Sequence, residues 1–448
     1  ILKWVIDVIK ESIAQIFTLL GFYIAWFTLT GTAQDIVGIA IVISTAIFPL
    51  YFGSLFEDNQ YVEVFGINYK NTALIQHTTT LVFICLAILI PILSGIADYK
   101  KNKVSFLKFF CYLGSLCCIG LYFFTIENIY LGLFFYFFAL FSFWASLVFY
   151  NSYLPEIAFP HQQDRISAVG YSYGYVGSVL LLLINLMMVL FPSTFGFQDT
   201  IEPMKISFVM VGLWWAGFSQ YTFYYLPKNQ IQFPKKDFLK KSILFGGFYQ
   251  LKNVWKLVKK QESIKKFLIA FFVFSCALQT IILIATYFGE QEIIWKEGEK
   301  QIGLIICTLL IQLIAILGAM LTAKLSEKIG NIQTLIYLNI FWFMLCVGGY
   351  FIKYSYEFYV VAALVGLVMG GIQALSRSTY SKLIPATENT CSYFSFYQMC
   401  MIISISLGTF MSGIVDQLTG SLRNSIIIFA VIFIFGAILL KDIKMKKL

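Results

Sequence analysis

Side chains that could do chemistry are few in this sequence, and they do not cluster. The chain contains two histidines, His77 and His161, which stand far apart. The carboxylates Asp98, Glu156 and Asp164 stand at the ends of long apolar runs and not inside them. Metal sites and most hydrolytic sites need several such ligands together, and the sequence has no Walker-type loop or paired-aspartate motif. It therefore predicts no enzyme, no metal site and no cofactor.

The composition is that of a membrane protein. Of 448 residues, 59% are hydrophobic and 12% are charged, and the mean hydropathy is +0.80. A soluble protein carries roughly 25% charged residues. The 46 Phe, 27 Tyr and 8 Trp exclude a disordered chain. The nine cysteines are an odd number and lie mostly in apolar runs, which excludes a secreted disulfide scaffold.

Long apolar runs must position the few polar groups. A bilayer core of about 30 Å needs roughly 20 apolar residues per helix. The runs are continuous and too long for barrel strands, so we expect an all-α polytopic membrane protein with 12 transmembrane helices. The expected spans are about 36–55, 74–96, 104–125, 128–152, 169–192, 206–226, 265–288, 301–324, 333–353, 358–380, 392–417 and 424–441. A further stretch, 16–30, is half of a longer first helix, a surface-lying segment or a thirteenth span.

The basic residues predict the orientation of these spans. Most of the 32 Lys and Arg follow spans 2, 4, 6, 8 and 10 or lie at the C-terminus. Basic loops stay in the cytoplasm, so we expect cytoplasmic N- and C-termini. The net charge of +9 thus reports topology and needs no nucleic-acid partner. A composition rich in Ile, Lys and Phe fits an AT-rich bacterial genome, which predicts a multi-pass protein of the bacterial inner (cell) membrane.

The longest internal polar stretch divides the spans into two sets of six. We expect a six-helix bundle over 36–226, a basic cytoplasmic linker over 227–264 and a second six-helix bundle over 265–448. Apolar residues recur at helical spacing among the linker lysines, at Phe248, Leu251, Trp255 and Val258. This pattern predicts an amphipathic helix on the inner membrane surface. The linker is either a plain tether or a lipid-sensing element.

A short loop pattern occurs in both halves, after span 2 (94–103) and after span 8 (323–331). Each copy has small and aliphatic residues, then an acid, then basic residues in a tight turn. A carboxylate there can face the N-terminus of another helix or pair with basic groups, and such a contact between halves would hold one conformation. The expected gate residues are Asp98, Lys103, Glu327, Lys328 and Gly330, together with Asp164 and Arg165 of another short inner loop.

This loop pattern resembles the signature of the major facilitator superfamily, G-x-L-a-D-r-x-G-r-r. The second copy includes the turn glycine, Gly330, whereas the first has Lys101 at that position. The blocks 149–158, 163–168 and 170–177 are similar to the vacuolar amino-acid effluxers linked to autophagy, as are Gln279-Thr280, 370–378 and 383–385. The resemblance covers about 41–440. Residues 1–35 form a divergent N-terminal segment, because Asp35 alone stands near the position of the family's Asp-Trp-Ala-Asn-Ser-like stretch.

Polar residues within the spans are candidates for a substrate pathway. Gly366, Gly370, Gln373 and Arg377 share one helix face, which is either a pathway lining or a packing seam. The polar face with Gln279 in the seventh span, and the glycine-rich face with Asn185 in the fifth span, allow the same two interpretations. For each aromatic candidate the alternative to substrate contact is ordinary packing. The pathway candidates are Trp144, Tyr150, Asn151, Asn185, Gln279, Gln373 and Arg377.

The resemblance implies a secondary active transporter that works by alternating access between two bundles. With neutral polar candidates in the spans, we expect a small neutral metabolite as substrate, namely an amino acid. The expected partners are this small molecule, the lipid bilayer and a coupling proton carried by Asp35, Glu156 or His77, and we expect a monomer. The alternative is a non-transporting receptor or scaffold on a carrier fold.

Overall fold

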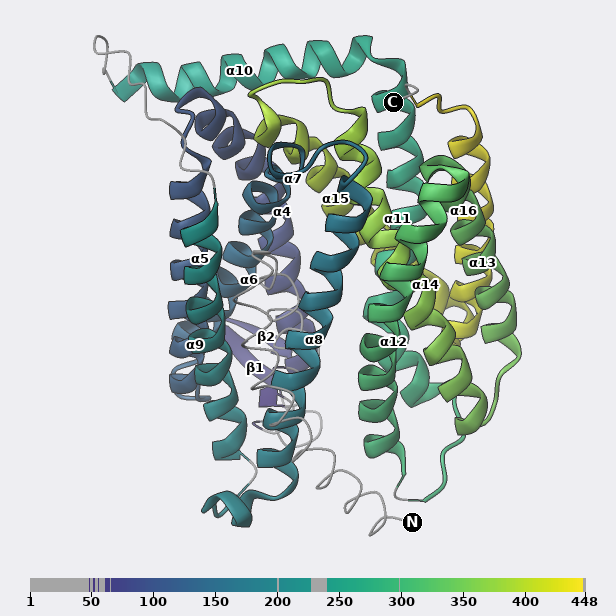
Figure 1. Cartoon of the computed structure of the whole chain (residues 1–448). Coiled ribbons are helices and arrows are strands. Elements are labelled where there is room, and N and C mark those ends of the chain that lie inside the picture. Colours follow the sequence, from purple (N-terminus) through teal and green to yellow (C-terminus); the bar gives the residue numbers. More distant parts are fainter. Residues whose placement is uncertain are drawn as a thin grey trace.

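The structure is a computed structural model of the chain, and it consists mainly of long helices (Figure 1). It describes residues 61–64, 66–199, 201–226, 240–297 and 299–445, together with Phe48, Tyr51, Phe52 and Leu55. The divergent segment 1–35, the apolar stretch 16–30 and most of the expected first span therefore lie outside the described residues.

The long helices are described in two sets that follow the chain order, here called the first and second groups. The first group is α4 (Asn71–Tyr99), α5 (Lys103–Gly120), α6 (Ile129–Asn151), α8 (Gln163–Leu190) and α9 (Ile201–Tyr225), with the short helix α7 (Leu154–Ile157). The second group is α11 (Glu262–Gln291), α12 (Lys300–Ile329), α13 (Asn331–Phe351), α14 (Ser355–Leu383), α15 (Thr390–Thr419) and α16 (Leu422–Lys441). The helix α10 (Lys240–Lys260) joins them and lies across one end of the molecule, here called the α10 end (Figure 1).

Ten of the described helices are long and apolar enough to cross a membrane, and they correspond to expected spans 2–5 and 7–12. The expected sixth span is helical as α9, which is not among these ten. The predicted helical membrane fold is thus confirmed. Besides the helices, the described residues contain a small antiparallel hairpin of β1 (Tyr61–Val64) and β2 (Ile67–Lys70) and an isolated bridge between Ile294 and Tyr354.

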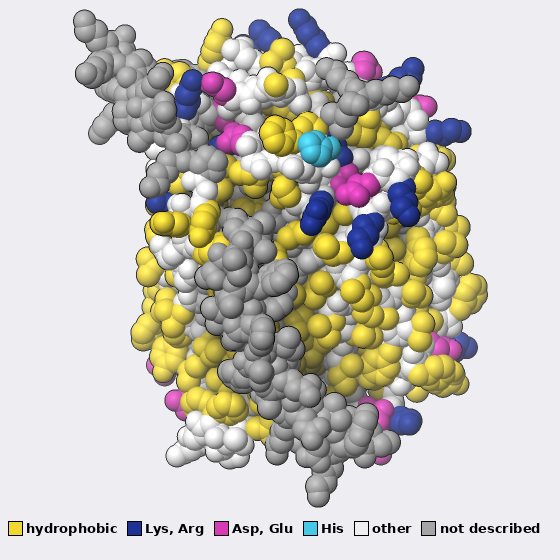
Figure 2. Space-filling model, in the orientation of Figure 1, with side chains coloured by type: hydrophobic (Ala, Val, Ile, Leu, Met, Phe, Trp, Pro, Cys, Tyr) yellow, Lys and Arg dark blue, Asp and Glu magenta, His cyan; other side chains and the backbone are white. Residues whose placement is uncertain are grey.

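The molecular surface has the layering expected of a membrane protein (Figure 2). The middle of the visible face is largely hydrophobic, whereas Lys, Arg, Asp and Glu gather toward its two ends. Large apolar side chains on the spans point outward, among them Leu116, Leu321 and Phe435, which are 66%, 57% and 56% exposed. Such a belt is stable only where lipid covers it.

Close glycine contacts hold α12 against α14 inside the second group. A Cβ at Gly318 would lie 1.9 Å from the Leu367 carbonyl oxygen, and one at Gly370 would lie 2.3 Å from the Ala315 carbonyl oxygen. Gly366 approaches the backbone of Ile311 in the same way. Gly366 and Gly370 therefore form a packing seam, and residues further along the helix meet the first group.

The two copies of the repeated loop both have a turn residue with a positive φ. Gly330, between α12 and α13, has φ 88°, and Lys101, between α4 and α5, has φ 50° at the corresponding position. The first copy thus has the positive φ at Lys101, without a glycine. The Lys101 side chain forms an ion pair with Glu388 at 2.7 Å, with both side chains largely exposed.

Replacing Lys101 by Gly is expected to stabilise the protein relative to replacing it by Ala. Both variants lose the exposed ion pair, which contributes less than about 1 kcal/mol, but only glycine relieves the left-handed strain. We expect the Gly variant to exceed the Ala variant by about 0.5–1 kcal/mol in free energy of unfolding. Thermal unfolding in detergent measures this, and equal stability of the two variants would contradict it.

Candidate functional site

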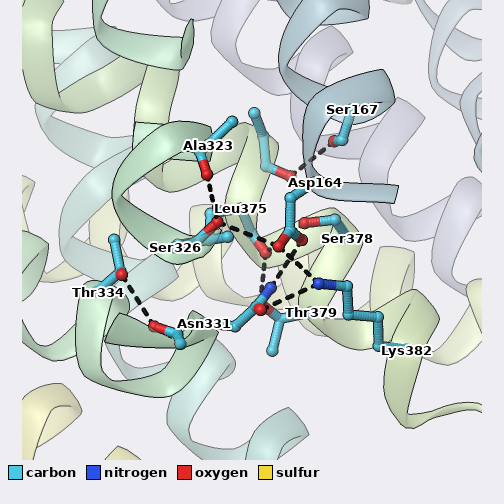
Figure 3. Close-up of polar contacts among 12 residues, drawn as sticks. Asp164, Ser167, Ala323, Ser326, Asn331, Thr334, Leu375, Ser378, Thr379 and Lys382 are labelled. Atoms are coloured by element: carbon cyan, nitrogen blue, oxygen red, sulfur yellow. Dashed lines mark hydrogen bonds and ion pairs between the residues drawn. The ribbon is translucent and has the colours of Figure 1, made fainter. Parts of the chain in front are cut away.

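Asp164 lies at the centre of a buried polar cluster between the two groups, at the α10 end (Figure 3). It stands in the first turn of α8, and its carboxylate accepts hydrogen bonds from Asn331 Nδ2 at 2.7 Å and Ser326 Oγ at 3.1 Å. Lys382 Nζ, near the end of α14, lies 2.5 Å from the same carboxylate and 3.1 Å from Asn331 Oδ1. All three partners belong to the second group, so the cluster joins the groups.

Helix ends place the charges of this cluster favourably. Asp164 lies near the positive N-terminus of α8, and Lys382 lies near the negative C-terminus of α14. Their side chains are 3% and 6% exposed. An unpaired charge at that depth is costly, so each residue depends on the other for as long as the groups stay together.

Asp98 makes a second link between the groups. It is buried near the end of α4, and its carboxylate accepts the backbone N–H groups of Cys391 at 3.1 Å and Ser392 at 2.6 Å. These donors belong to the first turn of α15, where no helical carbonyl can accept them. Asp98 therefore caps a helix of the second group, which is the kind of contact that the repeated loop predicts.

Lys103 extends this second link. It begins α5, is 4% exposed, pairs with Glu156 of α7 and donates to Thr390 Oγ1 at 3.0 Å. Thr390 in turn donates to Glu156 Oε1 at 3.1 Å. The start of α15 is thus held to three elements of the first group, namely α4, α5 and α7.

The second copy of the repeated loop meets the first group through different residues from those expected. Ser326 and Asn331 contact Asp164, whereas Glu327 and Lys328 are exposed and make no ion pair with the described residues. Gly330 forms the turn between α12, which carries Ser326, and α13, which begins at Asn331. Arg165 is also exposed, so beside Asp164 it points away from the cluster.

Arg377 forms a third link, deeper in the molecule. It is 2% exposed on α14 and donates from Nε to Ser167 Oγ at 2.9 Å and from Nη2 to the Ser167 carbonyl oxygen at 3.0 Å. Its Nη1 donates to Asn151 Oδ1 at 3.2 Å. The guanidinium carbon lies 4.7 Å from the ring centre of Tyr171 and 5.6 Å from that of Tyr150.

Gln373 lies one helical turn further from the α10 end and also meets the first group. Its Oε1 and the Tyr175 hydroxyl are 3.0 Å apart. Ser172, on the same helix as Tyr175, donates to the Ile316 carbonyl oxygen at 3.2 Å. These contacts lie near the midpoints of α8, α12 and α14.

The remaining pathway candidates do not bridge the groups within the described residues. Gln279 Nε2 lies 3.7 Å from Met401 Sδ, inside the second group. Trp144 packs edge-to-face on Phe83 inside the first group. Asn185 is 1% exposed, and its amide atoms have no hydrogen-bond partner in the described part of the chain.

Sequence reasoning missed several residues of the site, among them Lys382, Asn331 and Gln398. In the sequence Lys382 is one of many lysines expected on the cytoplasmic side, and Asn331 only follows the turn glycine. Gln398 is 1% exposed, and neither of its amide atoms has a hydrogen-bond partner among the described residues. For Gln398 the sequence did offer a signal, because a glutamine well inside an apolar run indicates a buried polar contact or a cavity.

The cross-group bonds share one location. Within the described ranges, every hydrogen bond or ion pair between the groups lies between the α10 end and about the middle of the helices. The same ranges contain none in the opposite half. This conformation is held closed at the α10 end.

Comparisons with known proteins agree with this architecture. The profile of the family described as "Vacuole effluxer Atg22 like" matches residues 53–447. The chain is similar to the MFS-type transporter YxiO of Bacillus subtilis, with 28% identity over 404 residues and 90% of each chain covered. It is also similar to autophagy-related protein 22 of Pichia angusta, with 24% identity over 453 residues, 87% of this chain and 76% of that one.

Solved structures resemble the whole described molecule. The E. coli fucose:proton symporter FucP superposes with a TM-score of 0.65 at 15% identity, over 95% of this chain and 100% of that one. The proton:xylose symporter XylE gives 0.66 at 12% identity, over 95% and 97%. At such identities these structures show the fold that the chain shares with them.

Proposed function

This chain belongs to the Atg22-like family of vacuole effluxers, transporters of the major facilitator superfamily, and from that premise we propose that it carries small neutral metabolites, namely amino acids, by alternating access. The relatives are membrane transporters, and the chain is not an enzyme. The proposal adds the substrate class and the way in which the two groups of helices move.

The observation that carries the proposal is the closed α10 end. Three links join the groups there, through Asp164, Asp98 and Arg377, and the described residues of the opposite half contain none. A carrier needs contacts that hold one end shut and can break to open it. The two groups then act as the two moving bundles.

The distribution of basic residues supports the proposed orientation. The exposed lysines of α10 and those near the C-terminus lie at the α10 end, and basic segments favour the cytoplasm. We propose that the α10 end faces the cytoplasm of a bacterial cell, so that the described conformation is closed to the inside. A monomer suffices for this mechanism, because both groups belong to one chain.

A coupling proton, if the carrier uses one, has few sites in this chain. Glu156 is partly buried in the second link, whereas His77 is exposed and stacks edge-to-face on Tyr69. Asp35 lies outside the described residues. Glu156 is our proposed proton site, because it accepts the hydrogen bond of Thr390 from the second group, and its protonation would weaken that bond as well as the pair with Lys103 inside the first group.

Counterflow in proteoliposomes tests the proposed function. Vesicles loaded with unlabelled leucine, tyrosine or other neutral metabolites should accumulate the same labelled compound, and protein-free vesicles should not. A Glu156→Gln variant should keep counterflow and lose uptake driven by a pH gradient. A folded protein that moves none of the compounds would support the scaffold alternative instead.

A further inference from the structure

Arg377 is a buried positive charge without a buried negative partner among the described residues. Three other cations provide the comparison within the same chain. Lys103 pairs with Glu156, Lys382 with Asp164, and Arg423 with Glu292 at 2.9 Å. Arg377 makes no such pair, and its hydrogen bonds all go to neutral oxygens.

The guanidinium also has donors to spare. It carries five N–H groups, and the three hydrogen bonds to Ser167 and Asn151 use three of them. Two N–H groups therefore have no hydrogen-bond partner in the part of the chain that the structure describes. A fork of N–H donors with no counter-charge fits a carboxylate, which can accept two parallel bonds from it.

The surroundings suit a small organic ion. The rings of Tyr171 and Tyr150 face the guanidinium, and aromatic faces also attract an ammonium group. Gln398 adds an unpartnered buried amide on α15. It lies seven residues after Cys391 and hence on the same helix face, and Cys391 Sγ lies 3.2 Å from Ser152 Oγ of the first group.

We propose that Arg377 binds the carboxylate of the transported molecule, so that amino acids, which are neutral overall as zwitterions, bind through their carboxyl group. This inference rests on the proposed transport function and adds the chemical group that the carrier recognises. The position fits, because Arg377 lies between the Asp164–Lys382 pair at the α10 end and the Gln373–Tyr175 contact near mid-helix.

The arrangement also explains how binding would accompany opening. Every hydrogen-bond acceptor of Arg377 belongs to the first group, whereas Arg377 belongs to the second. When the groups separate at the α10 end, Arg377 loses all three bonds and its donors become available. A carboxylate then takes the place of Ser167 and Asn151.

Ligand-induced thermal shifts and counterflow test this proposal together. The probes are leucine, leucinamide, which lacks the carboxylate, and 4-methylpentanoate, which lacks the ammonium group. For the wild type we expect leucine to stabilise the protein and compete in counterflow at least tenfold better than leucinamide. Arg377→Lys keeps the charge and loses the fork, and should weaken leucine binding roughly 10- to 100-fold. Arg377→Gln should abolish the preference for leucine over leucinamide.

The controls separate binding from gating and folding. Lys324→Gln removes an exposed cation from the part of α12 nearest the α10 end. This variant should keep the preference for leucine over leucinamide and the affinity for leucine. If Arg377 were only a latch, its variants would change rates and keep the preference for carboxylates. Absence of flux for every amino acid would overturn the proposed function. A wild type stabilised as well by amides as by the matching carboxylates would overturn the role of Arg377.

Discussion

Replacing Asp164 by Asn is expected to shift the protein away from the conformation closed at the α10 end. The change removes one charge of a pair whose side chains are 3% and 6% exposed, and it leaves Lys382 buried without a carboxylate. Breaking such a pair costs about 3–5 kcal/mol. Lys382 escapes this cost when the groups separate, because water then reaches it. The closed state should therefore lose roughly 150- to 5,000-fold in relative population.

Cys391 is a native reporter of this shift. It is fully buried at the interface between the groups, in the Asp98 link and not in the Asp164 cluster. In a background without the other eight cysteines, a maleimide should label Cys391 much faster in Asp164→Asn than in the wild type. Because the reporter lies in the other link, faster labelling shows that the groups separate and not only that Asp164 has changed. Counterflow should fall, since the variant seldom returns to the closed state.

Two further variants make this result specific. Asp164→Asn combined with Lys382→Met removes both charges and should restore slow labelling in large part. Glu388→Gln removes an ion pair that also crosses the interface, but its partners are 76% and 54% exposed. An exposed pair contributes less than about 1 kcal/mol, so labelling should change less than about fivefold. Slow labelling in Asp164→Asn itself would contradict the role of the buried pair.

The sequence predicts the helices of this fold better than their contacts. Ten expected spans reappear as long apolar helices, because hydrophobic length alone decides them. The hairpin 61–70 does not follow from hydropathy, since it lies in a short polar connection. The division into two moving bundles stays a prediction.

The site residues show where sequence reasoning ends. A carboxylate at the end of span 2 suggests a helix N-terminus as its partner, and Asp98 does meet one, but only the structure identifies it as α15. By the same register Glu327 is the expected gate acid, yet the interface uses Ser326 and Asn331. One residue of rotation, about 100° on a helix, separates Ser326 from Glu327. The sequence pattern does not resolve that difference, because it depends on how the groups dock.

Replacing Asp98 by Ala is expected to weaken the same closed state through a different physical cause. The change removes a helix cap made of two charge-assisted hydrogen bonds to the start of α15, at 3.1 and 2.6 Å. It leaves no cation unpaired, because Lys103 keeps Glu156. Loss of a cap costs about 1–2 kcal/mol, so the closed population should fall roughly 10-fold, less than for Asp164→Asn. Asp98→Asn retains an acceptor oxygen and should have a smaller effect than Ala.

The reporter for Asp98 must lie away from α15, since Cys391 itself contacts Asp98. Ser378 is fully buried beside Asp164, and its hydroxyl bonds only within α14, so Ser378→Cys in a cysteine-free background reports from the other cluster (Figure 3). Ser421→Ala is the matched control, because it removes the cap of α16 inside the second group. Both cap variants should lower thermal stability, but only Asp98→Ala should speed labelling at position 378. Equal labelling rates in Asp98→Ala and Ser421→Ala would mean that Asp98 stabilises α15 without holding the groups together. The second link would then not be part of the gate.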